Sequence, residues 1–275
     1  MATTTSPSEL LTTLRGDRTD RPAIDPMLAG GLRAWLEDEL ADLAGDLPAH
    51  HHLRLPARQI AQSDAACDPE GEQAALSVLV HALVAQHIVF GQVADPLADA
   101  VDALAASGAH GPLLERIAAL DDEASTVLAG ELAAHDLVLS GSIGRIPASW
   151  LPRSDVPIAV DLCGGRIRAS AKVDLVLGAP AGTVASRCLV DVVATPLGGH
   201  HADQLGALAL IETLRTGAAP LRVATLSTAT GEHLVLAVDD ALLTSSLRRL
   251  VDAARRLARA VELEDVDRPV TRIHA

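Results

Sequence analysis

The chain has 275 residues, 49% of them hydrophobic, and a formal net charge of −14 from 36 acidic and 22 basic side chains. This acidity counts against tight, non-specific binding to nucleic acid, which needs a basic face. Only 1% of the residues are aromatic, so the core must be built from Leu, Val, Ala and Ile.

The cysteines and the apolar runs predict where the protein resides. Cys67, Cys163 and Cys188 are too few and too scattered for a disulfide framework or for a zinc or iron–sulfur site. No basic segment followed by an apolar run opens the sequence, so we expect no signal peptide. The longest apolar run, 76–90, is broken by His81, Gln86 and His87 and is too short to cross a bilayer. We therefore expect a cytoplasmic protein without a membrane partner.

The first half of the chain is predicted to be mostly helical. Residues 1–24, rich in Thr, Ser, Pro, Asp and Arg, are expected to be a flexible N-terminus. Apolar spacing predicts a helix over 25–45, and a short strand over 53–60 is followed by a loop over 62–72. A strongly apolar helix is predicted over 73–92. Ala- and Leu-rich helices near 95–107, 111–120 and 122–138 are interpreted as a helical insertion, over 95–139, that packs on the core or on a protein partner.

From residue 157 the period of the apolar residues changes to two, which is typical of strands. After a break over 141–152, strands are predicted over 158–163 and 166–177, joined by a turn at Gly164 and Gly165. A third strand, 187–194, is nearly all apolar and is expected to be buried on both faces. A helix over 200–215, strands over 221–227 and 234–238, and a closing helix over 239–262 complete the pattern.

This order of elements predicts an α/β fold with a mixed central sheet and helices on both faces. We expect one domain over 25–262 and a polar tail over 263–275. The closing helix carries five arginines, which are interpreted either as phosphate contacts or as a solvated face paired with acids: Arg248, Arg249, Arg255, Arg256 and Arg259.

Two acids, Asp174 and Asp191, lie near the ends of neighbouring predicted strands. Two carboxylates brought together in this way are a means of holding a divalent metal. His201 and Gln204 open the following helix, where they either position a substrate or cap the helix.

Four short motifs occur in a consistent order along the chain. Residues 77–81, SVLVH, are similar to a G-x-x-x-H helix, with Ser77 in place of the glycine. Residues 171–174, AKVD, are similar to G-x-x-D, with Ala171 in place of the glycine. Residues 191–193, DVV, stand in the place of (D/E)-x-K, and residues 204–208, QLGAL, are similar to Q-L-x-x-Y, with Leu208 in place of the aromatic residue.

Through these motifs, residues 74–262 resemble the PD-(D/E)XK nuclease superfamily, closest to its RecB-type branch. The resemblance implies an αβββαβ, restriction-endonuclease-like core and Mg²⁺- or Mn²⁺-dependent hydrolysis of DNA. It implies His81, Asp174, Asp191 and the carbonyl of Val192 as metal ligands, and Asp174, Asp191 and Gln204 as catalytic residues.

The departure from the family pattern concerns the catalytic lysine. Val193 stands where the lysine belongs and can neither orient water nor offset charge. Lys172, the one lysine of the chain, lies two residues before Asp174 and shares its strand face, so it is a candidate substitute. The alternatives are a catalytically inactive nuclease-fold protein that acts as a binding or assembly module, and an unrelated α/β protein.

Overall fold

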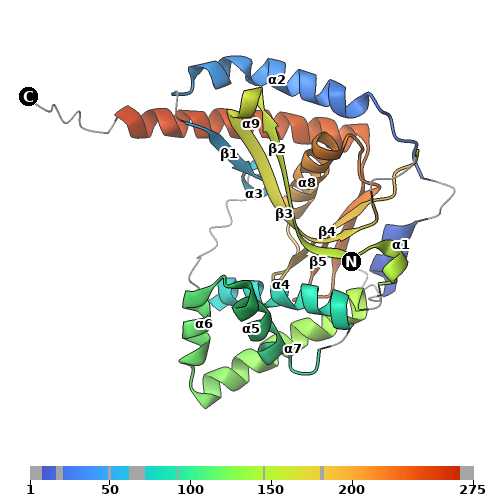
Figure 1. Cartoon of the computed structure of the whole chain (residues 1–275), viewed down its shortest axis with the longest axis vertical. Helices are drawn as coiled ribbons and strands as arrows, with labels where there is room; N and C mark the ends of the chain where they lie inside the picture. Colours follow the sequence, from blue (N-terminus) through green and yellow to red (C-terminus); the bar gives the residue numbers. More distant parts are fainter. Residues whose placement is uncertain are drawn as a thin grey trace, which may run out of the picture.

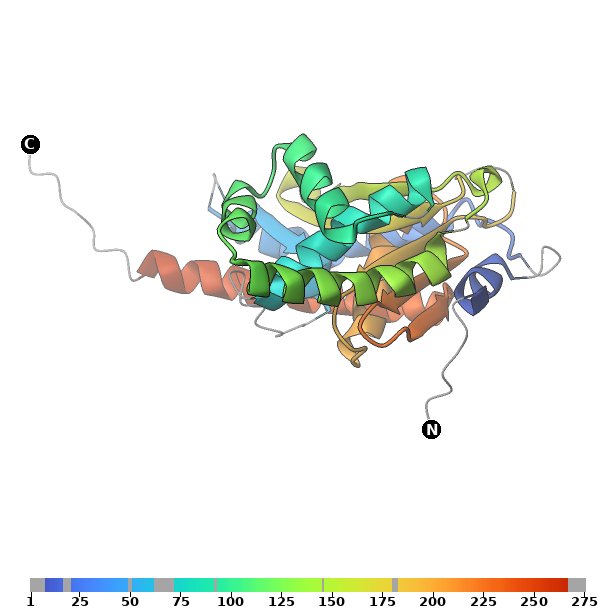
Figure 2. The same cartoon turned by 90° about the horizontal axis from the view of Figure 1, so that it is seen from below.

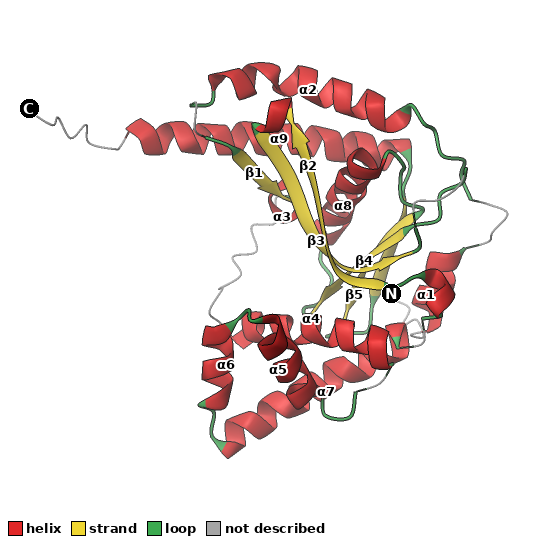
Figure 3. Cartoon of the chain, viewed as in Figure 1, coloured by secondary structure: helices red, strands yellow, loops and turns green. Residues whose placement is uncertain are grey.

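The computed structural model describes residues 8–16, 21–48, 51–61, 72–91, 93–144, 146–179 and 183–266. In this part of the chain a mixed six-stranded sheet lies between two groups of helices (Figures 1 and 3). The predicted α/β fold with a mixed central sheet is therefore confirmed. The predicted tail over 263–275 lies mostly outside the described residues.

The sheet is built around β3 (Ile167–Leu177), its longest strand. The antiparallel β2 (Arg153–Leu162) follows one edge of β3 for nearly its whole length. The other edge is shared: β1 (Leu53–Pro56) pairs with residues 167–170, and β4 (Cys188–Val193) pairs with residues 175–177. Residues 171–174 lie between these two pairings, so β3 has a gap in its hydrogen bonding at this edge. Beyond β4 come β5 (Arg222–Ser227), parallel to it, and β6 (His233–Ala237).

Two hydrophobic clusters cover the two faces of the sheet. One joins the sheet to α2 (Leu28–Asp46), α3 (Ala57–Ile60), α8 (His200–Thr216) and α9 (Asp240–Val266). The other joins it to α1 (Ser8–Arg15), α4 (Glu72–Phe90), α5 (Pro96–Ser107), α6 (Gly111–Ala118) and α7 (Asp122–Ile143). Figure 2 shows α7, in light green, along the outside of this second layer. Both clusters consist of aliphatic residues, as the scarcity of aromatic residues requires.

A buried ion pair fixes α4 against α7. His87 Nε2 lies 2.6 Å from Asp136 Oδ1, and His87 Nδ1 lies 2.9 Å from the carbonyl oxygen of Gly91. Both ring nitrogens thus have an oxygen atom as partner, which fixes the orientation of the ring between the two helices. By length and composition, Gln73–Phe90 of α4 could cross a membrane, the one such helix among the described residues. In this structure it packs between the sheet, α5 and α7.

Four predicted elements differ from the structure. Residues 8–15, expected to be flexible, form α1, whose Leu10 and Leu14 are fully buried. The expected strand over 53–60 ends at Pro56 and continues as α3. The helix expected to end at 138 extends to Ile143 through a segment predicted to be a break. Finally, β2 begins at Arg153, five residues before the predicted start.

Candidate functional site

The gap in β3 pairing is where the predicted site lies. Asp174 is the last residue of the gap and is buried. Its Oδ2 atom accepts a 2.7 Å hydrogen bond from the backbone N–H of Val192, so a side chain replaces the missing strand partner. Because the N–H and C=O of one strand residue point to the same side, the Val192 carbonyl is directed toward this gap as well.

Asp191, on β4, is held from the opposite layer by α8. The side-chain amide of Gln204 donates to Asp191 Oδ2 at 3.1 Å. His201, predicted to be near this site, is turned away from it: its Nδ1 atom accepts from the N–H of Gly198 at 2.8 Å. Burial lowers the pKa of His201. Gln204 therefore contacts the acid pair, whereas His201 stabilises the start of the helix.

His81 reaches the same place from α4. Its Nε2 atom lies 3.4 Å from Asp174 Oδ2, and its Nδ1 atom donates to the carbonyl of Ser77 at 2.6 Å. Burial alone would lower the pKa of His81, but the charges of Asp174 and Asp191 outweigh it and raise this pKa to about 9. The ring is consequently protonated at neutral pH.

The surroundings of Asp191 disfavour its charged form. Burial, the nearby charge of Asp174 and a hydrogen bond between the two side chains raise the pKa of Asp191 well above its ordinary value, with only His81 opposing. Two adjacent carboxylates cannot both ionise without a counter-charge. Among the described residues, the one ion-pair partner of either acid is His81.

A cleft of about 430 Å³ opens onto these side chains. One wall carries His81, Asp174 and Asp191, and the facing wall comes from α5 and the loop before α6, including His110. Lys172 lines the cleft too, and its Nζ atom forms a 2.8 Å ion pair with Asp155 Oδ1.

Val193, which stands where the resemblance places a lysine, lies outside the cleft. Val193 pairs with Ser227 of β5, is only partly buried and does not line the cleft. By strand alternation its side chain lies on the same face as that of Asp191. Lys172 is the one lysine or arginine among the described residues that line the cleft.

Sequence reasoning missed three residues of this region. Asp155, with a backbone φ of 54°, lies between the two residues that pair with Val173 and Leu175, and so faces Asp174 across the strands. His110 lies in the predicted helical insertion over 95–139, to which the sequence assigned no site residue. Thr225 is paired in register with Asp191, and its buried hydroxyl has no partner in the described part of the chain. Alternation carries no signal for any of the three, because each depends on how distant elements pack.

The donor set fits a divalent cation, but His81 and Asp174 are in contact with each other. Two carboxyl groups, an imidazole and a backbone carbonyl are ligands that Mn²⁺ accepts, and Mg²⁺ accepts the oxygen atoms. In the described ranges, no group of three or more His, Cys, Asp or Glu side chains already has the geometry of a metal site. Binding would therefore require His81 to separate from Asp174, which it contacts at 3.4 Å.

The arginines of α9 lie away from the cleft. Arg249 pairs with Asp203 at 2.8 Å and Arg255 with Glu39 at 3.1 Å, while Arg256 donates to the carbonyl of Gln59 at 3.4 Å. These contacts favour the interpretation of α9 as a solvated face paired with acids.

Comparisons with known proteins give no family. No family model matches the sequence, and no curated protein matches it. Among solved structures, one match is the crystal structure of SSO0001, which is 11% identical, with 84% of this chain and 86% of that chain covered and a TM-score of 0.30. A TM-score this low does not establish a shared fold.

Proposed function

We propose that the protein is a metal-dependent phosphodiesterase of the PD-(D/E)XK nuclease type, acting on DNA. The observation that supports this most is the meeting of His81, Asp174 and Asp191, from three separate elements, in one cleft with Lys172 at its margin. The chain order α4, β2, β3, β4, α8, β5 also agrees with the αβββαβ core that the sequence motifs imply.

In this proposal each residue has a defined part. Asp174, Asp191, His81 and the Val192 carbonyl would hold Mg²⁺ or Mn²⁺, which supplies a Lewis acid for a phosphate and acidifies water. Gln204 positions Asp191 through its 3.1 Å hydrogen bond. Lys172, whose side chain is 61% exposed, supplies the mobile cation that Val193 cannot, once a phosphate competes with Asp155 for it.

The test combines calorimetry with a cleavage assay on single- and double-stranded DNA, after EDTA treatment and addition of Mn²⁺ or Mg²⁺. Asp174→Ala is expected to abolish both metal binding and cleavage. Lys172→Ala is expected to keep metal binding and to lower the cleavage rate by about 10²–10⁴-fold. Arg168→Ala is the matched control, because Arg168 forms a similar exposed ion pair with Asp161 on the same strand, outside the cleft.

A second function is favoured by Val193. If the wild-type protein binds Mn²⁺ but leaves DNA intact, it is a nuclease-fold protein that acts by binding or assembly, and Val193→Lys should then restore cleavage. Absence of both metal binding and cleavage would overturn the nuclease assignment and leave an unrelated α/β protein.

The place of action and the protein partner belong to the same proposal. Cys163 and Cys188 are free thiols, which suits a reducing cytoplasm, and cell fractionation tests this. The role of the helices over 95–139 as a partner surface remains a prediction, because in the structure they form a wall of the cleft.

A further inference from the structure

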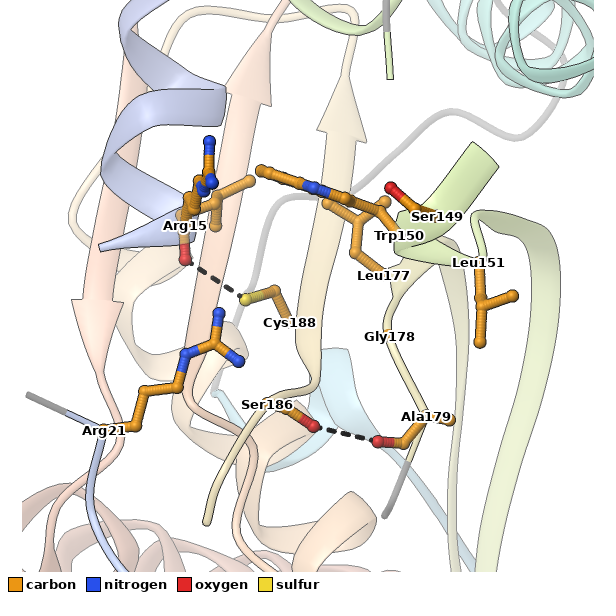
Figure 4. Close-up of a pocket in the computed structure, with 11 residues that line it drawn as sticks. Arg15, Arg21, Ser149, Trp150, Leu151, Leu177, Gly178, Ala179, Ser186 and Cys188 are labelled. Atoms are coloured by element: carbon orange, nitrogen blue, oxygen red, sulfur yellow. Dashed lines mark hydrogen bonds between the residues drawn. The ribbon is translucent and has the colours of Figure 1, made fainter. Parts of the chain in front are cut away.

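A second cavity, of about 240 Å³, lies where β3 ends and β4 begins. Figure 4 shows Arg15 and Arg21 on one side of it, Ser149 and Trp150 on the other, and Cys188 between them. The acids of the first site are not among the residues that line this cavity. The cavity is therefore distinct from the cleft described above.

Among the described residues that line the cavity, two are arginines and none is acidic. Neither Arg15 nor Arg21 forms an ion pair or a side-chain hydrogen bond in the described part of the chain, and the Nε atom of Arg21 is buried without a partner. The guanidinium of Arg222 lies behind them, against Gly16, and has no acidic partner in the described ranges either. Two arginines at one cavity repel each other, and a buried N–H without an acceptor costs free energy, so an anion bound here reduces both penalties.

The walls of the cavity are fixed by backbone hydrogen bonds. The N–H of Ala185 donates to the carbonyl of Pro22 at 2.9 Å, which holds the residue after Arg21 against the loop before β4. The N–H of Gly178 donates to the carbonyl of Trp150 at 2.6 Å. Gly178 has a φ of 82°, and a Cβ there would lie 2.7 Å from the carbonyl oxygen of Ser186, so the turn requires glycine. The backbone on both sides of the cavity is thus held in place before any ligand arrives.

The chemistry of the lining defines the ligand. Guanidinium groups bind phosphate through paired, charge-assisted hydrogen bonds, and an indole face accepts a planar ring by stacking. A volume of about 240 Å³ is below the usual range for drug-sized ligands, so it admits one such unit rather than a length of strand. We propose that Arg15, Arg21 and Trp150 form a binding pocket for a 5′-phosphorylated nucleotide, with the phosphate on the arginines and the base on the indole.

This ligand has two sources, a free mononucleotide or the 5′-phosphorylated end of a strand, and the proposal does not depend on nuclease activity. The chain suits fluorescence, because it has two tryptophans and no tyrosine. In a Trp35→Phe background, Trp150 is the one fluorophore. The probes are inorganic phosphate, adenosine, adenosine 5′-monophosphate, and a short oligothymidylate with and without a 5′-phosphate.

Adenosine 5′-monophosphate is expected to quench Trp150, and calorimetry is expected to show weaker binding of phosphate alone. Arg15→Gln and Arg21→Gln should each weaken binding of the nucleotide about tenfold or more. Arg15 is exposed, so its variant retains the fold even if Arg21→Gln does not. Trp150→Leu should remove the advantage of the nucleotide over phosphate, and Arg259→Ala, an exposed arginine on α9, should change nothing.

The comparison of the probes shows which of the two ligands the pocket binds, and which results would contradict the proposal. Tighter binding of the phosphorylated oligonucleotide than of the mononucleotide assigns the pocket to strand ends, and the reverse assigns it to free nucleotides. Equal binding of adenosine and its monophosphate, or no binding of any phosphorylated probe at millimolar concentration, overturns the proposal.

Discussion

Asp191 lies in an environment that disfavours its charged form. It is buried, lies beside a second carboxyl group, and has no lysine or arginine in ion-pair contact among the described residues. Its raised pKa is the measure of this cost, because each proton retained replaces a charge that the surroundings do not stabilise. A site of this kind favours a bound cation at the expense of the stability of the empty protein.

The first prediction concerns Asp191→Asn, which cannot ionise and whose amide can donate a hydrogen bond to Asp174, as a protonated Asp191 would. Because the folded-state pKa of Asp191 is raised, the aspartate stabilises the fold fully only below its ordinary pKa of 3.8, and this stabilisation is lost as the pH rises through the folded-state value. At pH 8 in EDTA, the free energy of unfolding by urea should therefore rise by about 1–2 kcal/mol in the variant.

The same variant should lose its response to metal. Mn²⁺ should raise the melting temperature of the wild type, as any ligand of the folded state does, and leave Asp191→Asn unchanged. Asp102→Asn, at an exposed position of α5, is the control. A variant that is less stable than the wild type at pH 8 in EDTA would contradict the conclusion that the charged form of Asp191 is disfavoured in the folded protein.

At the scale of elements, α8 and α9 pack unusually closely. A Cβ atom on Gly206 would lie 2.4 Å from Ser246 Oγ but 3.7 Å from Ser246 Cβ. The hydroxyl of Ser246 is directed back to the carbonyl of Leu242 at 2.8 Å. The closest contact therefore depends on one oxygen atom, with Leu242 Cδ1 next at 3.3 Å, and α8 is the helix that positions Gln204.

The second prediction is a double-mutant cycle at this contact. Gly206→Ala alone should lower the free energy of unfolding by about 1–3 kcal/mol, because the helices must separate. In combination with Ser246→Ala the added methyl group meets the Cβ atom of residue 246 at 3.7 Å and only the flexible end of Leu242 at 3.3 Å, and alanine favours the helix over glycine by about 1 kcal/mol. The double variant should equal or exceed Ser246→Ala in urea denaturation, and additive losses would show that the helices are not held at this distance.

The sequence predicted best those elements whose pattern is set by burial. The strands β3 and β4 and the start of α8 were placed within one residue. Apolar residues alternate along β3, and β4 is apolar apart from Asp191. The start of β2 was missed because its first residues are polar and half exposed, and Asp155 adopts a left-handed conformation there. The helix α1 was missed because three leucines stand among Thr, Ser and Arg residues, and their burial is decided by the sheet.

At the scale of the whole molecule, the sheet brings together polar side chains from distant parts of the chain. Motif order was enough to name His81, Asp174, Asp191 and Gln204, and the structure brings these four together. The facing wall of the cleft and the pair of Lys172 with Asp155 could not be predicted, because no local pattern encodes which distant segments will meet. The arginine cavity was missed for the same reason, since Arg15 and Arg21 lie in a segment predicted to be flexible.

The last prediction concerns this N-terminal segment, α1. It tests whether α1 is a stable part of the helical layer that covers the second hydrophobic cluster. Leu14 is fully buried against the second hydrophobic cluster, and its carbonyl accepts a hydrogen bond from the Cys188 thiol at 3.5 Å. Leu14→Ala should lower the free energy of unfolding by about 2–5 kcal/mol, as truncation of a buried leucine does. Leu11→Ala, at a partly buried position of the same helix, should cost clearly less.

If both substitutions changed urea stability by less than about 0.5 kcal/mol, as surface substitutions do, α1 would be detached in solution. The flexible N-terminus predicted from composition would then be correct, and the arginine cavity would lose one of its walls.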